Sequence, residues 1–321
     1  MDYDKKPVPK SIAVFGAAGR VGQPLADYVR YAAPDVCLRL ITSSAAAVSG
    51  LQNGYPAADV VVANYLDPDS LKPALEDMEG IFVVTPSGLD EVRAMQNLIA
   101  AVRAAGTVKH IVRVVGYGPE STLDQVPEEL AARGGDGSQH YIAKAELARS
   151  GLPVTFLNCG ATFMDNLLLA SGGIRDRDLF IYPPLYVPFV DARDVGEVGA
   201  RLLLSDDVRH ISQFHTMNNG QDQLSSEEIA EMMSDILRRH IAYDGSRETF
   251  MKELGPLLDQ RAGRAGEAEY RWDYVQFWEN TNSVIWSLNN FAERMLGRRP
   301  TTLRAWLMEH KGFFGAAPDH G

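Results

Sequence analysis

The segment Ile12-Ala-Val-Phe-Gly16-Ala-Ala-Gly19-Arg-Val-Gly22 decides how this sequence is interpreted. An apolar run typical of a buried strand leads into three glycines spaced G-x-x-G-x-x-G, and residues 21–31 then have helical apolar spacing. Glycines let backbone N–H groups approach a pyrophosphate, and a helix N-terminus adds positive potential. A packing turn without a ligand is the less favoured interpretation, because the turn follows the first strand of a strand–helix series.

That series continues over the first 160 residues. Continuous apolar runs rich in β-branched residues indicate strands covered on both faces, and they alternate with helical patterns. The sequence therefore predicts the α/β fold class, with a doubly wound parallel Rossmann sheet. The expected strands are 11–15, 36–41, 59–63, 80–85, 110–115 and 154–157, and the expected helices are 21–31, 70–78, 90–105 and 139–150.

The pattern changes after Gly160. A strand is expected at 214–217, and an amphipathic helix starts at Ser225 or Ser226, because Ser225-Ser-Glu-Glu228 fits a capping box. Helical segments dominate from there to Leu307, which predicts a smaller, mainly helical C-terminal substrate lobe.

We assign residues 11–160, with return segments near 189–217, to an NAD(P)-binding domain. Residues 161–188 and 218–315 form the expected substrate-binding lobe. The ends, 1–10 and 315–321, look loosely ordered.

Composition limits the function classes. The chain has 321 residues, 45% of them apolar and 23% charged, which is typical of a globular protein. Its net charge of −11 argues against direct binding of nucleic acid, which needs lysine and arginine to displace counterions. Two cysteines, Cys37 and Cys159, are too few for a disulfide framework or a four-cysteine zinc site, and no metal site is expected. No apolar run has transmembrane length and no signal core is present, so we expect a cytoplasmic protein with no membrane partner.

The end of the second strand usually distinguishes NAD from NADP, because an acidic residue there holds the ribose 2′-hydroxyl. This chain has Thr42-Ser43-Ser44 instead, and Arg20 lies in the adjacent glycine turn. Hydroxyls can donate to a 2′-phosphate and no carboxylate repels it, so NADP(H) is favoured over NAD(H). That these hydroxyls only cap a loop is an equally open alternative.

Several motifs together resemble the NmrA-like branch of the atypical short-chain dehydrogenases, over residues 11 to 315. The resemblance implies a Rossmann fold and a relation to NADPH-dependent reductases of quinones, triphenylmethane dyes, isoflavones and lignans. The same family includes nucleotide-sensing regulators without turnover. The motifs are Gly16-Ala-Ala-Gly-Arg-Val-Gly22, Tyr65-Leu-Asp-Pro-Asp-Ser-Leu71, Val83-Val-Thr-Pro86, His140-x-x-x-Lys144, Ser150-Gly-Leu-Pro-Val-Thr-Phe-Leu157, Phe163-Met-Asp-Asn166, Phe189-Val-Asp-Ala-Arg-Asp194 and Leu296-Gly-Arg-Arg-Pro300.

The chain departs from the superfamily's usual Ser, Tyr and Lys triad, in which Tyr-x-x-x-Lys lies on one helix. The fifth strand ends at Gly116 without the serine, and His140 stands at the tyrosine position beside Tyr141. The triad is therefore not transferred.

The expected catalytic residues are Lys144, His140 and Tyr141. His140 and Lys144 are four apart on a helix and share a face. Lys144 could bond the nicotinamide ribose, and His140, with an ordinary pKa near ~6.5, could deliver a proton at neutral pH. A solvated lysine and a packed histidine are the plainer alternatives.

Ligands in this topology sit outside the carboxyl ends of the strands, which adds Thr85, Pro86 and Gly116 to the cofactor site. Substrate contacts are expected from the residues after strands five and six, although core packing explains them equally well. The expected cofactor-binding residues are Gly16, Ala18, Gly19, Arg20, Val21, Gly22, Thr42, Ser43, Ser44, Thr85, Pro86, Gly116 and Lys144; the expected substrate residues are Tyr117, Phe163, Met164 and Asn166. The aromatic stretch 270–278 predicts a helix that buries its apolar face, with a substrate lid as the less favoured alternative.

Three functions are compatible with these residues. We rank first an NAD(P)H-dependent reductase whose partner is a bulky aromatic, quinone-like or enone-like small molecule, with the hydride supplied by the cofactor. A non-catalytic NAD(P) sensor ranks second, and an epimerase or lyase on the same fold ranks third. A homodimer is possible.

Overall fold

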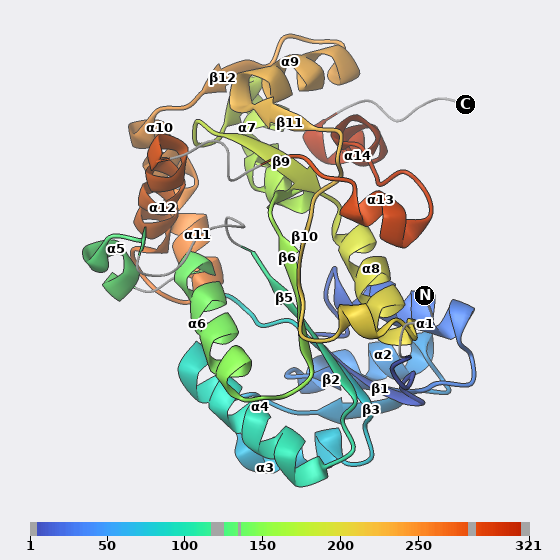
Figure 1. The fold of residues 1–321 in the computed structure, drawn as a ribbon. Coiled ribbons are helices and arrows are strands. Elements are labelled where there is room, and N and C mark those ends of the chain that lie inside the picture. Colours follow the sequence, from blue (N-terminus) through green and yellow to red (C-terminus); the bar gives the residue numbers. More distant parts are fainter. Residues whose placement is uncertain (1–4, 117–124, 134–135, 282–286, 316–321) are drawn as a thin grey trace.

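A seven-stranded parallel sheet forms the centre of the protein (Figure 1). The structure is a computed structural model, which describes residues 5–116, 125–133, 136–281 and 287–315. The strand order is β10-β6-β5-β4-β1-β2-β3. The chain therefore adds β2 and β3 on one side of β1 and the later strands on its other side, so the strand order reverses at β1. The strands are β1 Ser11–Phe15, β2 Cys37–Thr42, β3 Asp59–Val62, β4 Gly80–Val83, β5 His110–Val115, β6 Val154–Cys159 and β10 Phe214–Met217.

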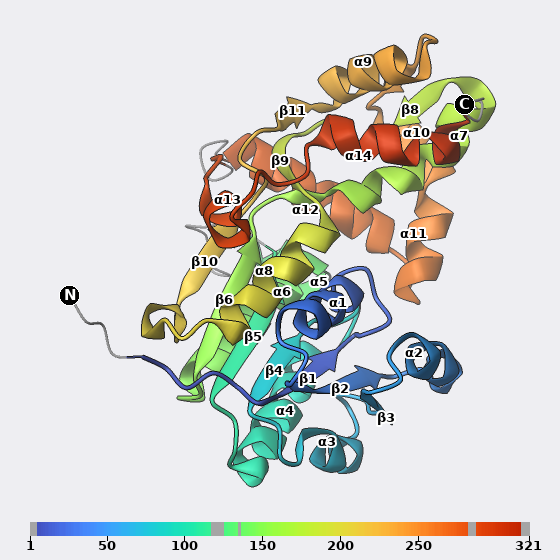
Figure 2. The same cartoon turned by 90° about the vertical axis from the view of Figure 1, so that its right-hand side faces the viewer.

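Helices cover both faces of this sheet, as the predicted doubly wound fold requires (Figure 2). Alternate residues of β1 point to opposite faces: Ile12 and Val14 enter one core, and Ala13 and Phe15 the other. The first core is closed by α1 Gly22–Ala32, α2 Val48–Gly54 and α8 Ala192–Leu204; the second by α3 Pro68–Leu75, α4 Glu91–Ala105 and α6 Asp136–Arg149. The predicted fold class is therefore confirmed.

The rest of the chain builds two small sheets and several helices above the carboxyl ends of the large sheet. One small sheet has the order β11-β9-β7 and the other pairs β12 with β8. The predicted capping box is present, since Ser225 caps α9 and the Glu228 side chain accepts from the Ser225 N–H. The elements are β7 Thr162–Phe163, α7 Ser171–Arg177, β8 Leu179–Ile181, β9 Tyr186–Val190, β11 Gln223–Ser225, α9 Ser226–Leu237, β12 Ala242–Asp244, α10 Arg247–Glu253, α11 Gly255–Ala262, α12 Glu267–Thr281, α13 Phe291–Leu296 and α14 Leu303–His310, with α5 Glu128–Arg133 preceding α6 and short 3-10 helices at Ala45–Ala47, Met164–Ala170, Val208–His210 and Lys311–Phe314.

Two helices of the expected substrate lobe also contribute to the cores of the large sheet. Tyr270 and Trp278 of α12 are buried in the core on the α4 and α6 face, while Trp272 of the same helix packs on Phe250. Ala292 and Leu296 of α13 are buried in the core on the α1 and α8 face. The aromatic stretch is thus a helix with buried aromatic residues, as predicted.

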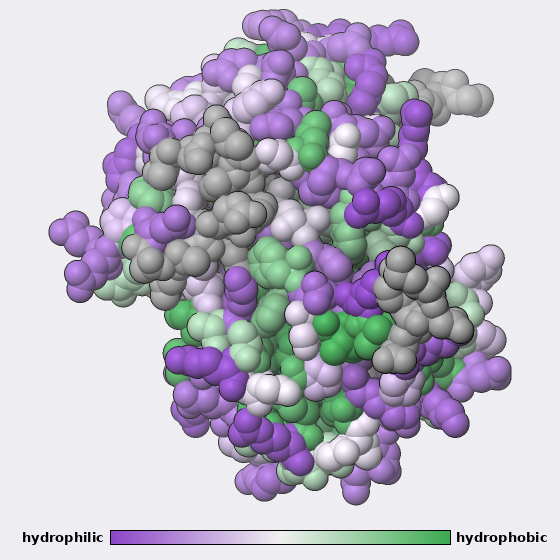
Figure 3. Space-filling view, in the orientation of Figure 1, coloured by the Kyte–Doolittle hydropathy of each residue, from purple (hydrophilic) through white to green (hydrophobic). Residues whose placement is uncertain are grey.

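The N-terminal segment is attached to the body from Lys5 onward. The Lys6 N–H donates to the Asp206 carbonyl (2.9 Å), its buried ammonium donates to the Leu203 carbonyl (3.1 Å), and Lys5 pairs with Asp206. The expectation that residues 1–10 are loosely ordered is therefore wrong for Lys5–Lys10, because polar contacts hold this segment beside the end of α8. Hydrophilic residues cover most of the molecular rim in Figure 3. Among the described residues, no helix is both long and apolar enough to cross a membrane.

Candidate functional site

The glycine turn joins β1 to α1 at the point where the strand order reverses. Gly16 has φ +67°, and its carbonyl accepts from the Gly19 N–H (2.8 Å). A Cβ on Gly16 would lie 2.7 Å from Val84 Cγ1, and a Cβ on Gly22 would collide with the Gly16 carbonyl. Both positions therefore require glycine for the turn itself.

Gly19 differs from these two in the room it leaves, because its Cβ would meet only the Gly16 carbonyl oxygen, at 3.1 Å, and the residue is exposed, as Gly16 also is. The N-cap of α1, Val21, makes no side-chain cap, and the first turn holds no acidic residue. The first N–H groups of a helix lack intrahelical acceptors, and here no side chain of the described residues replaces them. The turn thus leaves room for a pyrophosphate group to approach the backbone closely, and the helix N-terminus supplies positive potential.

The end of β2 has exposed hydroxyls without a carboxylate. The Thr42 hydroxyl accepts from the Ser44 N–H (3.1 Å), so this one side chain does cap the loop. Ser43 and Ser44 are exposed.

Arg20 points toward the residues that follow β6. Its guanidinium lies 4.9 Å from the centre of the Phe163 ring, and its Nη1 lies 3.7 Å from Asp165 Oδ2. β6 and β2 lie on opposite sides of β1 in the sheet, so these contacts direct Arg20 away from Thr42–Ser44.

His140 lies at the carboxyl ends of β5 and β6. A Cβ on Gly116 would be 3.5 Å from His140 Nε2 and 3.7 Å from the Cys159 carbonyl oxygen, so the imidazole lies beside Gly116, close to where β5 and β6 end. A nicotinamide bound in the usual way would approach the same edge of the sheet.

Lys144 and Tyr141 each have a neighbour away from these strand ends. The Lys144 ammonium lies 4.7 Å from the centre of the Phe214 ring, and Phe214 pairs with Phe156, three residues before the end of β6. Tyr141 is 5% exposed and belongs to the core beneath α12. Burial raises the pKa of Tyr274 in this core, and the neighbouring Tyr141 raises it further. Of the three expected catalytic residues, the structure brings only His140 to the strand ends.

The segment after β6 adds a carboxylate that sequence reasoning missed. Asp165 Oδ2 is buried and accepts no hydrogen bond from the described residues, and burial raises the pKa of this carboxyl. Phe163 and Asn166 are half-buried beside it, whereas Met164 is fully buried in a core formed with α9 and α14. The missed signal was Asp165's place inside the quoted Phe163–Asn166 motif. Tyr117, an expected substrate residue, lies outside the described residues.

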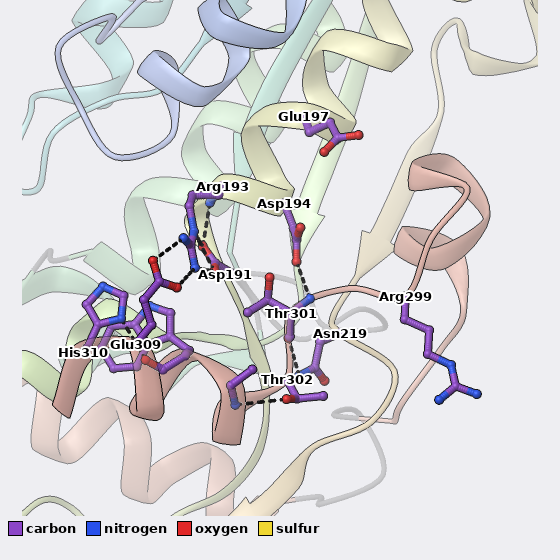
Figure 4. A network of polar contacts seen from close by, with 12 residues as sticks. Asp191, Arg193, Asp194, Glu197, Asn219, Arg299, Thr301, Thr302, Glu309 and His310 are labelled. Atoms are coloured by element: carbon purple, nitrogen blue, oxygen red, sulfur yellow. Dashed lines mark hydrogen bonds and ion pairs between the residues drawn. The ribbon is translucent and has the colours of Figure 1, made fainter. Parts of the chain in front are cut away.

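A polar network fixes the start of α8 against the C-terminal helices (Figure 4). Asp191 caps α8 through the Arg193 N–H (2.8 Å), and the Arg193 guanidinium bridges Asp191 to Glu309 of α14. Asp194 accepts from the Thr301 N–H and from Arg298, each at 2.8 Å. The sequence motifs at 189–194 and 296–300 thus belong to one network, which joins the start of α8 to the C-terminal segment.

A comparison with known proteins finds a relative over part of the chain. The chain is 33% identical over 182 residues to an NAD(P)H azoreductase of Xenophilus azovorans, which covers 55% of this chain and 58% of that protein. The match therefore spans little more than half of the azoreductase's length.

Solved structures resemble nearly the whole chain. An NADPH-dependent quinone oxidoreductase of Escherichia coli, complexed with NADPH, has a TM-score of 0.75 and 20% identity, covering 94% of this chain and 99% of that one. The triphenylmethane reductase of Citrobacter sp., complexed with NADP(H), has a TM-score of 0.71 and 19% identity with the same coverage. At these identities the likeness shows the fold alone. The NmrA-like family model matches residues 9–265, and the chain therefore belongs to the NmrA-like family.

Proposed function

We propose that this protein is an NAD(P)H-dependent reductase that transfers a hydride to a conjugated aromatic small molecule of the azo or quinone type. The observation that carries the proposal is the glycine turn at the strand-order reversal. Its Gly16 and Gly22 positions have no room for a side chain, and the N-terminus of α1 has no side-chain cap. The likeness to an azoreductase supports the reductase over the two alternative functions.

The same residues define how a dinucleotide would be held. The backbone of Gly16–Gly22 would bind the pyrophosphate, and Thr85, Pro86 and Gly116 would border the nicotinamide half. We infer a preference for NADP(H), supported by the exposed Ser43 and Ser44 hydroxyls and the missing carboxylate at the end of β2. Arg20 would support that preference only after leaving Phe163 and Asp165.

The protein's own residues would orient the cofactor and the substrate and supply one proton to the substrate. A bound nicotinamide supplies the hydride. His140 Nε2, beside Gly116, would donate a proton to the substrate heteroatom that gains electron density. Lys144 remains a proposed ribose anchor, which requires its ammonium to leave the Phe214 ring.

The substrate would lie between the strand ends and the residues that follow β6. The half-buried Phe163 ring, with the Arg20 guanidinium over it, offers an aromatic and cationic surface for a planar conjugated molecule. We therefore also propose that residues 161–188 and 218–315 are the substrate-binding part of the chain.

Anaerobic NADPH oxidation against azo dyes, quinones and enones tests this function. We expect NADPH consumption with at least one azo or quinone compound, and weaker activity with NADH. Tight NADPH binding without turnover on any compound would instead support a nucleotide sensor.

A further inference from the structure

A buried ion pair lies beneath the strand ends, and the proposed mechanism does not use it. Arg113 of β5 and Glu91, the first residue of α4, meet at 2.5 Å between Nη2 and Oε1, with side chains 1% and 0% exposed. Taking two charges out of water carries a large desolvation cost, and apolar replacements of such pairs are often neutral or stabilising. Stability alone is therefore a weak explanation for this pair.

The pair holds the loop that follows β4. Arg113 Nη2 donates to the Thr85 hydroxyl (2.7 Å), and this hydroxyl in turn donates to Glu91 Oε1 (3.3 Å). Thr85 is thereby oriented by two charged groups at once.

Gln139 connects the same pair to α6. Its Nε2 donates to Glu91 Oε2 (3.3 Å) and to the Pro86 carbonyl (3.2 Å), and its Oε1 accepts from the Gly88 N–H (2.7 Å). Gln139 is 7% exposed and directly precedes His140 on the helix.

On its other side the loop approaches the end of α11. Gly88 has φ +80°, and a Cβ there would lie 3.2 Å from the Ala262 carbonyl at the end of α11. Gly88 therefore lies between α6 and the end of α11, and Gln139 hydrogen-bonds the Thr85–Gly88 loop to α6.

We propose that Gln139, held by the Glu91–Arg113 pair, is a positioning residue that fixes the Thr85–Gly88 loop relative to His140. This inference rests on the proposed function, in which the loop borders the nicotinamide and His140 donates the proton. A displacement of either element by about 1 Å can cost on the order of 10²-fold in rate.

Gln139→Met tests the inference, because methionine has a similar length and makes none of the three hydrogen bonds. In the ligand-free protein, hydrogen exchange at the Gly88 amide should become at least tenfold faster. The NADPH dissociation constant should rise about threefold to tenfold, and turnover should fall about 10- to 100-fold, with kcat affected more than KM for the aromatic substrate.

Thr155→Val is the matched control, since Thr155 makes hydrogen bonds to the His110 ring and to the His210 carbonyl near the starts of β5 and β6, at the opposite ends of these strands from the loop. It should lower the thermal midpoint and leave NADPH affinity and kcat unchanged. If Gln139→Met does not fold, Gln139→Asn keeps the amide but shortens its reach, and the same changes are expected.

The outcomes separate the two proposals. A wild-type protein that neither binds nor oxidises NADPH contradicts the proposed function, while faster Gly88 exchange in Gln139→Met would still support the positioning of the loop. Unchanged Gly88 exchange, or unchanged kcat in a folded variant of an active enzyme, overturns the inference.

Discussion

Replacing Gly19 by valine separates cofactor binding from folding. Gly19 is exposed, and its Cβ would meet only the Gly16 carbonyl at 3.1 Å, so a shift of a few tenths of an ångström accommodates the side chain. The same replacement at Gly22 would drive a side chain into the Gly16 carbonyl and open the turn. We therefore expect Gly19→Val to fold and Gly22→Val to lose stability.

The expected loss of affinity follows from the phosphate contacts. A valine at this turn would hold the pyrophosphate away from the backbone N–H groups near the start of α1. Losing one hydrogen bond to a charged group costs about 1.5–3 kcal/mol, which corresponds to about a 10- to 150-fold higher NADPH dissociation constant.

Calorimetric titration of NADPH, together with the thermal midpoint, measures both effects. Gly172→Val is a suitable control, because a Cβ at Gly172 of α7 would meet nothing within 4 Å. A folded Gly19→Val protein whose dissociation constant stays within twofold of the parent would refute the assignment of the turn as the pyrophosphate site.

Three further predictions concern chemistry, cofactor choice and pH. His140→Phe should retain NADPH affinity, lower turnover about 10²–10⁴-fold and remove an activity-linked ionisation near neutral pH; parent-like rates from about pH 5 to 9 would make His140 structural. Ser43→Asp should shift the ratio of NADP to NAD affinity toward NAD, because a carboxylate repels a 2′-phosphate, and titrations with both dinucleotides measure that ratio. Burial lowers the pKa of His110 to about 3 and of His215 to about 4, below the 6.5 of an unfolded histidine, so the unfolded state binds more protons in this window. The thermal midpoint should therefore be highest above about pH 6.5 and fall as the pH drops toward 4, and His215→Phe should reduce that slope; an equal slope in the variant would count against this origin.

The strands and helices of the large sheet could be predicted well because each of them has its own pattern of neighbouring residues. The run 11–15, the glycine turn and the helix at 22–32 each have their own periodicity, and the same holds for α4 and for the capping box of α9. The small strands β7, β8 and β9 were missed, because strands of two to five residues have little periodicity and form only when tertiary pairing supplies partners.

The site residues were predicted less completely, since helical spacing predicts which residues share a helix face but not how deeply each side chain is buried. His140 and Lys144 do share a helix, yet four residues advance about 6 Å along its axis, and their contacts lie at different levels of β6. The buried Glu91–Arg113 pair was missed, although an arginine inside the apolar run 110–115 was a usable signal, because a charge in a covered strand needs a partner. Asp165 could not be recognised as buried without the packing of Phe163 and Arg20.

The most direct measurement of the central claim is a single-turnover reaction under anaerobic conditions with NADPH deuterated at the transferable position of the nicotinamide. We predict that NADPH and an azo or quinone substrate disappear together in a one-to-one ratio and that deuterium slows the step. Gly19→Val should need about 10- to 150-fold more NADPH than the parent to reach half of its maximal rate. Saturable NADPH binding without any transfer of deuterium or loss of substrate, across the azo and quinone compounds, would contradict it.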